Sequence, residues 1–221
     1  ADGVWLAANG DQLRLWNLRE GGKPKVFEEG GHCVAFSHDS RLLAWGDNRG
    51  HIRVWDVKNE EIIHDFAPST PVGALAFSPN GDHLVGGMGV PFLRSRARQC
   101  PLWVFDLKSG EKLPSLPHHR GHVAAIRFSR DGTHLASASH DGKVALWNTK
   151  NWTVQKEFKI PGTAFYSVDF SNDGAHVAAG ADRSIHVWQL DTSELIATLE
   201  GHGNWVTDIA FAPDGKTLAS V

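Results

Sequence analysis

The residue types of a hydrolytic triad lie close together in the middle of the chain. His119 could act as a general base, Ser137 or Ser139 as a nucleophile, and Asp141 as the carboxylate that orients the histidine. The same residue types also satisfy one another's hydrogen bonds inside packed proteins. The elements that carry these residues therefore decide between a catalytic and a structural role.

Zinc binding is the second chemistry that the sequence raises, because the chain has 13 histidines. The run PHHRGH brings together His118, His119 and His122, but it lacks the paired ligand spacing and the second ligand cluster of a structural zinc site. Three other histidines share one repeat position, six residues after a phenylalanine: His83, His134 and His176. We expect no metal and no cofactor.

The elements around these residues repeat along the chain. A phenylalanine followed by a small residue and a turn recurs at spacings of 41, 51, 42 and 41 residues, at Phe36, Phe77, Phe128, Phe170 and Phe211. A second aromatic anchor recurs at spacings of 39, 50, 42 and 41 residues, at Trp16, Trp55, Phe105, Trp147 and Trp188. A period of about 40 to 45 residues is typical of a four-stranded propeller blade.

Each repeat can be divided into four short strands joined by tight turns. In the repeat that contains Asp141, we expect strands at 123–128, 134–139, 143–148 and 153–158, separated by SRDG, HDG and TKNW segments. Small residues in the second strand would let neighbouring sheets approach closely. The predicted fold class is all-β, built from four-stranded antiparallel sheets.

These anchors and turns resemble the WD-repeat family of β-propellers, and the likeness covers essentially the whole chain. The resemblance implies that an Asp six residues before the Trp bonds to a His of the segment leading into the blade, and that a Ser or Thr and the Trp steady this pair. The matching positions are His119, Asp141, Trp147, Asp182, Trp188 and His202, and Ser137 or Ser139 could complete the network. On this interpretation the triad residues are structural.

The network pattern is absent from the other repeats, where the Asp position holds Gly10, Arg49 and Gln99. We expect those blades to rely on apolar packing instead.

The repeats divide the chain into about five blade-equivalents. The predicted segments are a partial blade at 1–29, blades at 30–67, 68–118 with an insertion at 89–101, 119–160 and 161–200, and a partial blade at 201–221. Both ends supply a second strand for one blade, so we favour an excerpt of a ring of six to eight blades. A five-bladed ring with a frayed tail, or an oligomer paired through open strand edges, are the alternatives.

Charge and composition argue against several function classes. A formal net charge of −3 gives no basic face for nucleic acid or an anionic membrane. No apolar run approaches the roughly 20 residues that span a bilayer, and the start lacks the order of a signal peptide. Cys33 and Cys100 lie far apart in unlike contexts, which favours a reducing compartment. We expect a cytoplasmic protein.

The third repeat is about nine residues longer than its neighbours, and the excess contains Arg94, Arg96 and Arg98 beside an apolar run. A basic, partly apolar loop on a rigid scaffold would suit partner docking. A solvated insertion without function is the equal alternative.

The segments leading into the blades are the second candidate surface. In this family, partners often contact the residue before the first strand and the residue two further on, which here are Trp205 and Thr207, His122 and Ala124, Ala164 and Tyr166, and Pro71 and Gly73. An exposed Trp205 would be a strong anchor, since such aromatics often cost at least about 2 kcal/mol of binding when truncated. The alternative is that Trp205 folds inward between blades.

The resemblance implies a noncatalytic scaffold that binds protein or peptide partners through Trp205, Tyr166, His122 and the arginine loop. A sensor or regulatory module of a larger multidomain protein, such as a bacterial signalling protein, is one alternative. A propeller hydrolase or lyase is another, but SHDG at 139–142 lacks the spacer of the sialidase-type box and no carboxylate pair converges by register. We predict that the protein is not an enzyme.

Overall fold

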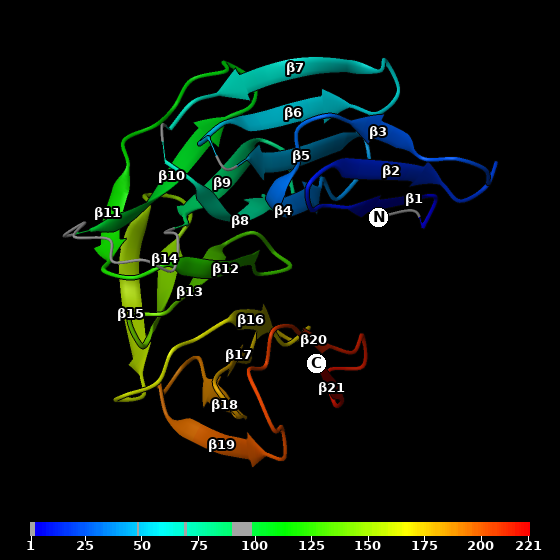
Figure 1. Cartoon of the computed structure of the whole chain (residues 1–221). Helices are drawn as coiled ribbons and strands as arrows, with labels where there is room; N and C mark the ends of the chain where they lie inside the picture. Colours follow the sequence, from blue (N-terminus) through cyan, green and yellow to red (C-terminus); the bar gives the residue numbers. More distant parts are fainter. Residues whose placement is uncertain (1–2, 48, 69, 90–98) are drawn as a thin grey trace. The chain divides into compact units, whose positions relative to one another are not determined.

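The computed structural model describes residues 3–47, 49–68, 70–89 and 99–221, and these form strands and turns only. The chain divides into two compact units, residues 1–97 with 101–115 and residues 98–100 with 116–221. Each unit contains antiparallel sheets that follow one another along the chain (Figure 1). Within the described ranges, no helix has the length and apolar character needed to cross a bilayer.

The first unit begins with an incomplete sheet and continues with a complete one. A three-stranded sheet consists of β1 (Trp5–Ala8), β2 (Leu13–Asn17) and β3 (Lys25–Phe27). A four-stranded sheet follows with β4 (Gly31–Phe36), β5 (Leu42–Asp47), β6 (Ile52–Asp56) and β7 (Glu61–Phe66). The strands β8 (Val72–Phe77), β9 (His83–Met88) and β10 (Cys100–Asp106) then pair in chain order.

The second unit contains two complete sheets and a strand pair. After β11 (Leu116–His119), one sheet contains β12 (Val123–Phe128), β13 (His134–Ser139), β14 (Lys143–Asn148) and β15 (Thr153–Lys159). The next contains β16 (Ser167–Phe170), β17 (His176–Gly180), β18 (Ser184–Gln189) and β19 (Leu195–Glu200), and β20 (Ile209–Phe211) pairs with β21 (Leu218–Ser220). The predicted all-β class with four-stranded antiparallel sheets is confirmed, although the predicted boundary after residue 118 falls inside β11.

The turn after each first strand explains the repeated Phe-Ser signature. The Ser129 hydroxyl donates to the Asp131 carboxylate at 2.6 Å and accepts the backbone N–H of His134 at 2.9 Å. Ser37 and Ser171 make the corresponding bonds in their own repeats. The serine thus joins the two sides of the turn and fixes where the second strand begins, which is at the histidine of the shared repeat position in β9, β13 and β17.

A β-bulge accompanies the repeated tryptophan. The pairing of the third strand with the fourth shifts register between Val54 and Trp55, between Leu146 and Trp147, and between Val187 and Trp188. A bulge bends its strand and increases the local twist. Because the bulge lies at the same place in three sheets, it belongs to the geometry of the repeat.

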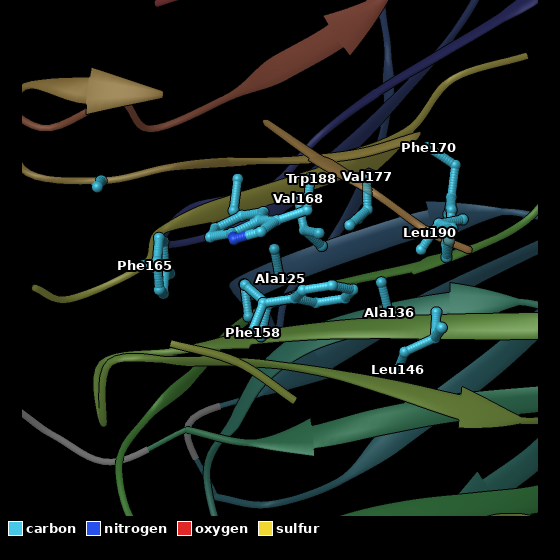
Figure 2. Packing of buried hydrophobic residues seen from close by; sticks show 14 residues of the cluster. Ala125, Ala136, Leu146, Phe158, Phe165, Val168, Phe170, Val177, Trp188 and Leu190 are labelled. Atoms are coloured by element: carbon cyan, nitrogen blue, oxygen red, sulfur yellow. The ribbon is translucent and has the colours of Figure 1, made fainter. Parts of the chain in front are cut away.

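Neighbouring sheets pack face to face through apolar side chains. In the second unit, the cluster between the β12–β15 and β16–β19 sheets includes Phe158, Phe165 and Trp188, and Figure 2 shows these aromatic side chains among smaller aliphatic ones. Phe158 lies 5.3 Å and Phe165 5.8 Å from the Trp188 ring, measured between centroids. Ala136 of β13 is fully buried on this face, as the expectation of small residues in second strands requires.

Close approach of the sheets is most evident at Gly46 in the first unit. A Cβ atom at this position would lie 2.6 Å from the Val72 Cβ and 2.9 Å from the Cys33 Sγ. Both distances are shorter than real Cβ contacts. Glycine is therefore required here by the neighbouring sheet and not by the backbone conformation.

Candidate functional site

The structure brings His119, Ser137, Asp141 and Trp147 into one hydrogen-bonded network. His119 ends β11, Ser137 lies in the middle of β13, and Asp141 lies in the turn from β13 to β14. The His119 Nδ1–H donates to the Asp141 carboxylate at 3.1 Å, and His119 Nε2 lies 2.8 Å from the Ser137 hydroxyl. The Trp147 indole N–H donates to the same hydroxyl at 2.9 Å.

The order of groups is that of a hydrolytic triad, but the Ser137 hydroxyl cannot reach a substrate. Both Ser137 and His119 have 0% exposed surface, and the Trp147 indole occupies one side of the serine oxygen. A nucleophile must approach a substrate atom to within about 3–3.5 Å, which this burial prevents. The arrangement can satisfy buried polar groups, but it offers no reaction centre.

Asp141 is held in its charged form by this network. Burial opposes ionisation, but the hydrogen bond and positive field of His119 and the backbone N–H of Arg120 outweigh it and lower the pKa of Asp141 to about 2. Ser139 has a separate role in the same turn, since its hydroxyl donates to the Gly121 carbonyl at 3.1 Å and accepts the Asp141 N–H at 3.2 Å.

The other predicted network positions differ from this arrangement. His202 Nε2 lies 2.8 Å from the Ser220 hydroxyl, at the same sequence separation as His119 and Ser137. Asp182 accepts a hydrogen bond at 2.9 Å from the Tyr166 hydroxyl instead of from a histidine. Trp188 packs within the apolar cluster described above.

The blade with Arg49 has a polar link besides the apolar packing that we expected. Arg53 on β6 bonds to the buried Asp47 at 3.2 Å and pairs with Asp65, its cross-strand partner on β7, at 3.5 Å. Glu29 also contacts Arg53. An arginine in the third strand thus supplies the polar link that the motif residues supply elsewhere. Because Arg53 does not occupy a motif position, the motif could not predict this link.

The blade with Gly10 also has a polar link. The Asn9 side chain accepts the Gly31 N–H at 2.9 Å and donates to the Cys33 carbonyl at 2.8 Å. The amide therefore joins the first sheet to β4 of the next one, in addition to the expected apolar packing. Gln99 is exposed.

The histidine run does not form a metal centre in the described part of the chain, where no group of three His, Cys, Asp or Glu side chains is arranged to hold an ion. The three histidines have different surroundings. His118 lies edge-on to Trp147, with centroids 5.3 Å apart, and His119 belongs to the buried network. The His122 ring contacts His140 at 4.7 Å.

Four rings from three successive repeats form a continuous aromatic row, which we define as His122, His140, Tyr166 and Trp205. Neighbouring centroids are 4.7, 4.8 and 5.4 Å apart, and Tyr166 and Trp205 are stacked at an interplanar angle of 17°. Trp205 has 47% of its surface exposed. The alternative in which Trp205 folds inward is therefore wrong.

Backbone hydrogen bonds explain why these four positions meet. The His140 N–H donates to the His122 carbonyl at 3.0 Å, and the Tyr166 N–H donates to the Gly180 carbonyl at 2.9 Å. The Val206 N–H, next to Trp205, donates to the Ala181 carbonyl at 2.9 Å. Each segment leading into a first strand is thus tied to the end of a second strand, which places ring after ring along one edge of the second unit.

A hollow of about 430 Å³ lies beside the aromatic row. It is lined by His140, Asp141, Gly142, Lys143, Lys159, Ile160, Pro161, Gly162, Thr163, Ala164 and Asp182. Burial, partly offset by the Asp182 and Asp141 charges, lowers the pKa of His140. Burial and the Asp182 carboxylate raise the pKa of Tyr166 to about 12. Both rings are therefore uncharged at neutral pH.

The other residues predicted to contact partners in the segments leading into the blades have different surroundings. Thr207 is exposed and its N–H donates to the Val221 carbonyl at 2.8 Å, whereas Ala164 lines the hollow. Pro71 and Gly73 are partly buried in the first unit. Arg94, Arg96 and Arg98 lie outside the described residues, so their docking role stays a prediction.

Sequence reasoning missed that His140 belongs to the aromatic row and that Asp182 lines the hollow beside it. A usable signal existed, because both lie in the turn between the second and third strands, next to the segment that leads into the following blade. The register singled out the positions of that segment that are expected to contact partners, and it omitted the adjoining turn.

The chain matches the family model described as "WD domain, G-beta repeat" at residues 25–56, 110–148, 152–189 and 193–221, together more than half of its length. It is 26% identical to human F-box-like/WD repeat-containing protein TBL1X over 83% of this chain and 33% of that protein. It is 28% identical to the Saccharomyces cerevisiae target of rapamycin complex subunit LST8 over 89% of this chain and 67% of that protein. It is also 31% identical to human apoptotic protease-activating factor 1 over 95% of this chain and 20% of that protein. The chain thus spans about a third of TBL1X and a fifth of the apoptotic factor.

Proposed function

The chain belongs to the WD-repeat family of β-propeller proteins, and from this premise we propose that it is a noncatalytic scaffold that binds a protein or peptide partner at the aromatic row. The observation that carries this proposal is the continuous surface of His122, His140, Tyr166 and Trp205, which three repeats build jointly. Aromatic residues are enriched in protein interfaces and dominate their energetics.

Rigid support of the row favours binding to a partner. The segments that carry the rings are tied to strand ends by backbone hydrogen bonds, and the buried His119–Asp141 network lies directly beneath the turn that carries His140. A surface that is ordered before binding loses little conformational entropy when a partner docks. The burial of Ser137 supports the noncatalytic part of the proposal.

The relatives support the general class of function. The yeast relative is by name a subunit of a protein complex. The chain's likeness to this protein supports an interaction role. The capture experiment below would identify the partner.

Affinity capture with the full-length protein tests the proposal. Trp205→Ala should deplete the recovered partners, because truncation of an exposed aromatic anchor typically costs at least about 2 kcal/mol of binding. Ile196→Ala is the matched control, since Ile196 on the outer strand β19 has the same exposed fraction of 47%. Equal recovery by wild type and by Trp205→Ala would reject the aromatic row as the docking surface.

The arginine loop is tested in the same capture experiment. Replacing Arg94, Arg96 and Arg98 together by glutamine should reduce recovery if the loop contacts the partner, because three charged side chains are then lost from the interface. Unchanged recovery would assign partner binding to the aromatic row alone.

A regulatory module within a larger multidomain protein is the second candidate. The observation that favours it is that the chain spans only 20% of the human apoptotic protease-activating factor 1 while 95% of the chain is matched. Reading the complete open reading frame would decide between this candidate and a free-standing scaffold.

A further inference from the structure

We propose that the hollow beside the aromatic row binds a lysine or arginine side chain of the docked peptide, with Asp182 as the carboxylate that receives the positive charge. This inference rests on the proposed function and adds the chemistry of the partner to it. The elements concerned are the turn from β13 to β14, the turn from β17 to β18 and the segments before β16 and β20, all within the second unit (Figure 1).

Asp182 is the acidic group of the hollow that is available to a ligand. Its carboxylate accepts a hydrogen bond from the neutral Tyr166 hydroxyl at 2.9 Å. Among the residues that the structure describes, no Lys, Arg or His forms a salt bridge with Asp182, and the adjacent Arg183 is exposed without one. Asp141, by contrast, is already engaged by His119 and by two backbone N–H groups.

The two lysines that line the hollow do not cancel this charge. Lys143 pairs with Glu157 at 3.4 Å, and Lys159 pairs with the same carboxylate. Both lysines share the Glu157 carboxylate outside the hollow, so with Asp141 and Asp182 three carboxylates face two lysines and a net negative charge remains. Among the described residues, no cation pairs with Asp182 itself. The electrostatic complement of this site is a cation.

The walls of the hollow specify a long side chain. Ile160, Pro161 and Ala164 supply apolar surface, and the His140 ring borders the same space. Lysine and arginine bury an aliphatic stem against apolar surface and keep the charged head on a polar partner. A volume of about 430 Å³ admits such a side chain.

The aromatic row would hold the rest of the peptide. Tyr166 connects the two parts of the surface, because its ring stacks on Trp205 while its hydroxyl holds Asp182. A peptide residue that contacts the half-exposed Trp205 side chain would therefore be followed, along the row, by a basic side chain that enters the hollow. Tyr166 is a positioning residue in this arrangement.

Selection from a phage-displayed random peptide library on the full-length protein tests the inference. We expect the selected peptides to contain lysine or arginine next to an apolar or aromatic residue, and to lose binding to Trp205→Ala. The strongest peptide is then synthesised, and its Kd is measured by calorimetry. Asp182→Asn, which keeps the shape and removes the charge, should raise the Kd about tenfold.

Two controls isolate the charge. Asp191→Asn, at an exposed carboxylate in the turn from β18 to β19, should leave the Kd unchanged. A peptide with glutamine in place of its basic residue should bind more weakly and should no longer distinguish wild type from Asp182→Asn. Circular dichroism of each variant verifies that the fold is retained.

The outcomes separate the two proposals. Peptides that need Trp205 but lack a basic residue, or that bind Asp182→Asn as tightly as wild type, would overturn the inference and leave the proposed function intact. Failure to select any peptide that depends on Trp205 would reject the proposed docking surface, and the basic-residue inference with it.

Discussion

Replacing Asp141 by alanine should destabilise the protein by about 3 kcal/mol. The substitution removes the acceptor of the His119 Nδ1–H, and His119 is fully buried, so water cannot replace the lost bond. An orphaned buried donor costs about 1–3 kcal/mol, and bonds to a charged acceptor are roughly twice as strong as neutral ones. The Arg120 and Lys143 N–H groups also lose their acceptor, but water can reach them.

Urea unfolding followed by far-ultraviolet circular dichroism measures this loss as a shift of the midpoint at an unchanged slope. Asp182→Ala is the matched control, because Asp182 has the same position relative to its tryptophan but, within the described residues, accepts a side-chain hydrogen bond only from the partly exposed Tyr166 hydroxyl. We expect this control to lose less than about 1 kcal/mol. Equal losses in the two variants, or a loss below about 0.5 kcal/mol for Asp141→Ala, would refute the network as the source of stability.

Three further predictions follow from the contacts described above. Asp141 has a folded-state pKa of about 2, below its unfolded value, so its contribution of about 2 kcal/mol should be present above about pH 4 and lost as the pH falls toward 2. In urea titrations across that range, the stability difference between wild type and Asp141→Ala should shrink, and a constant difference would contradict this assignment. Gly46→Ala should cost about 1–3 kcal/mol in the same assay, because the added Cβ would lie 2.6 Å from the Val72 Cβ, and a neutral effect would show that the two sheets are not this close. Arg53→Met should cost about 3 kcal/mol, because it leaves the buried Asp47 charge without its cation, and thermal unfolding that matches wild type would indicate that the ion pair contributes nothing.

The sequence predicted the repeating unit well because that unit is encoded by local signals. Alternating strands and the Phe-Ser turn are short-range patterns, and the observed strands β12, β13, β14 and β15 match the predicted ones closely. The His119–Asp141 contact was also predictable, because the motif fixes both the residue types and their spacing. The buried Ser137 then decided between a catalytic and a structural role, and only coordinates could show that burial.

The aromatic row and the ion pairs of Arg53 could not be predicted in the same way. Whether His140 contacts Tyr166 depends on the packing of two successive repeats, which no spacing within one repeat encodes. Arg53 binds Asp47 because neighbouring strands bring them together, and neither residue lies at a motif position. Three-dimensional packing between repeats therefore determines most of the candidate surface.

Photo-cross-linking tests the central claim most directly. The full-length protein carries p-benzoylphenylalanine in place of Trp205 in one preparation and in place of Ile196 in another, since both side chains are exposed to the same fraction of 47%. The proposed docking surface predicts partner adducts from position 205 and none above background from position 196. Adducts from position 196 alone, or equal yields from both positions, would contradict it.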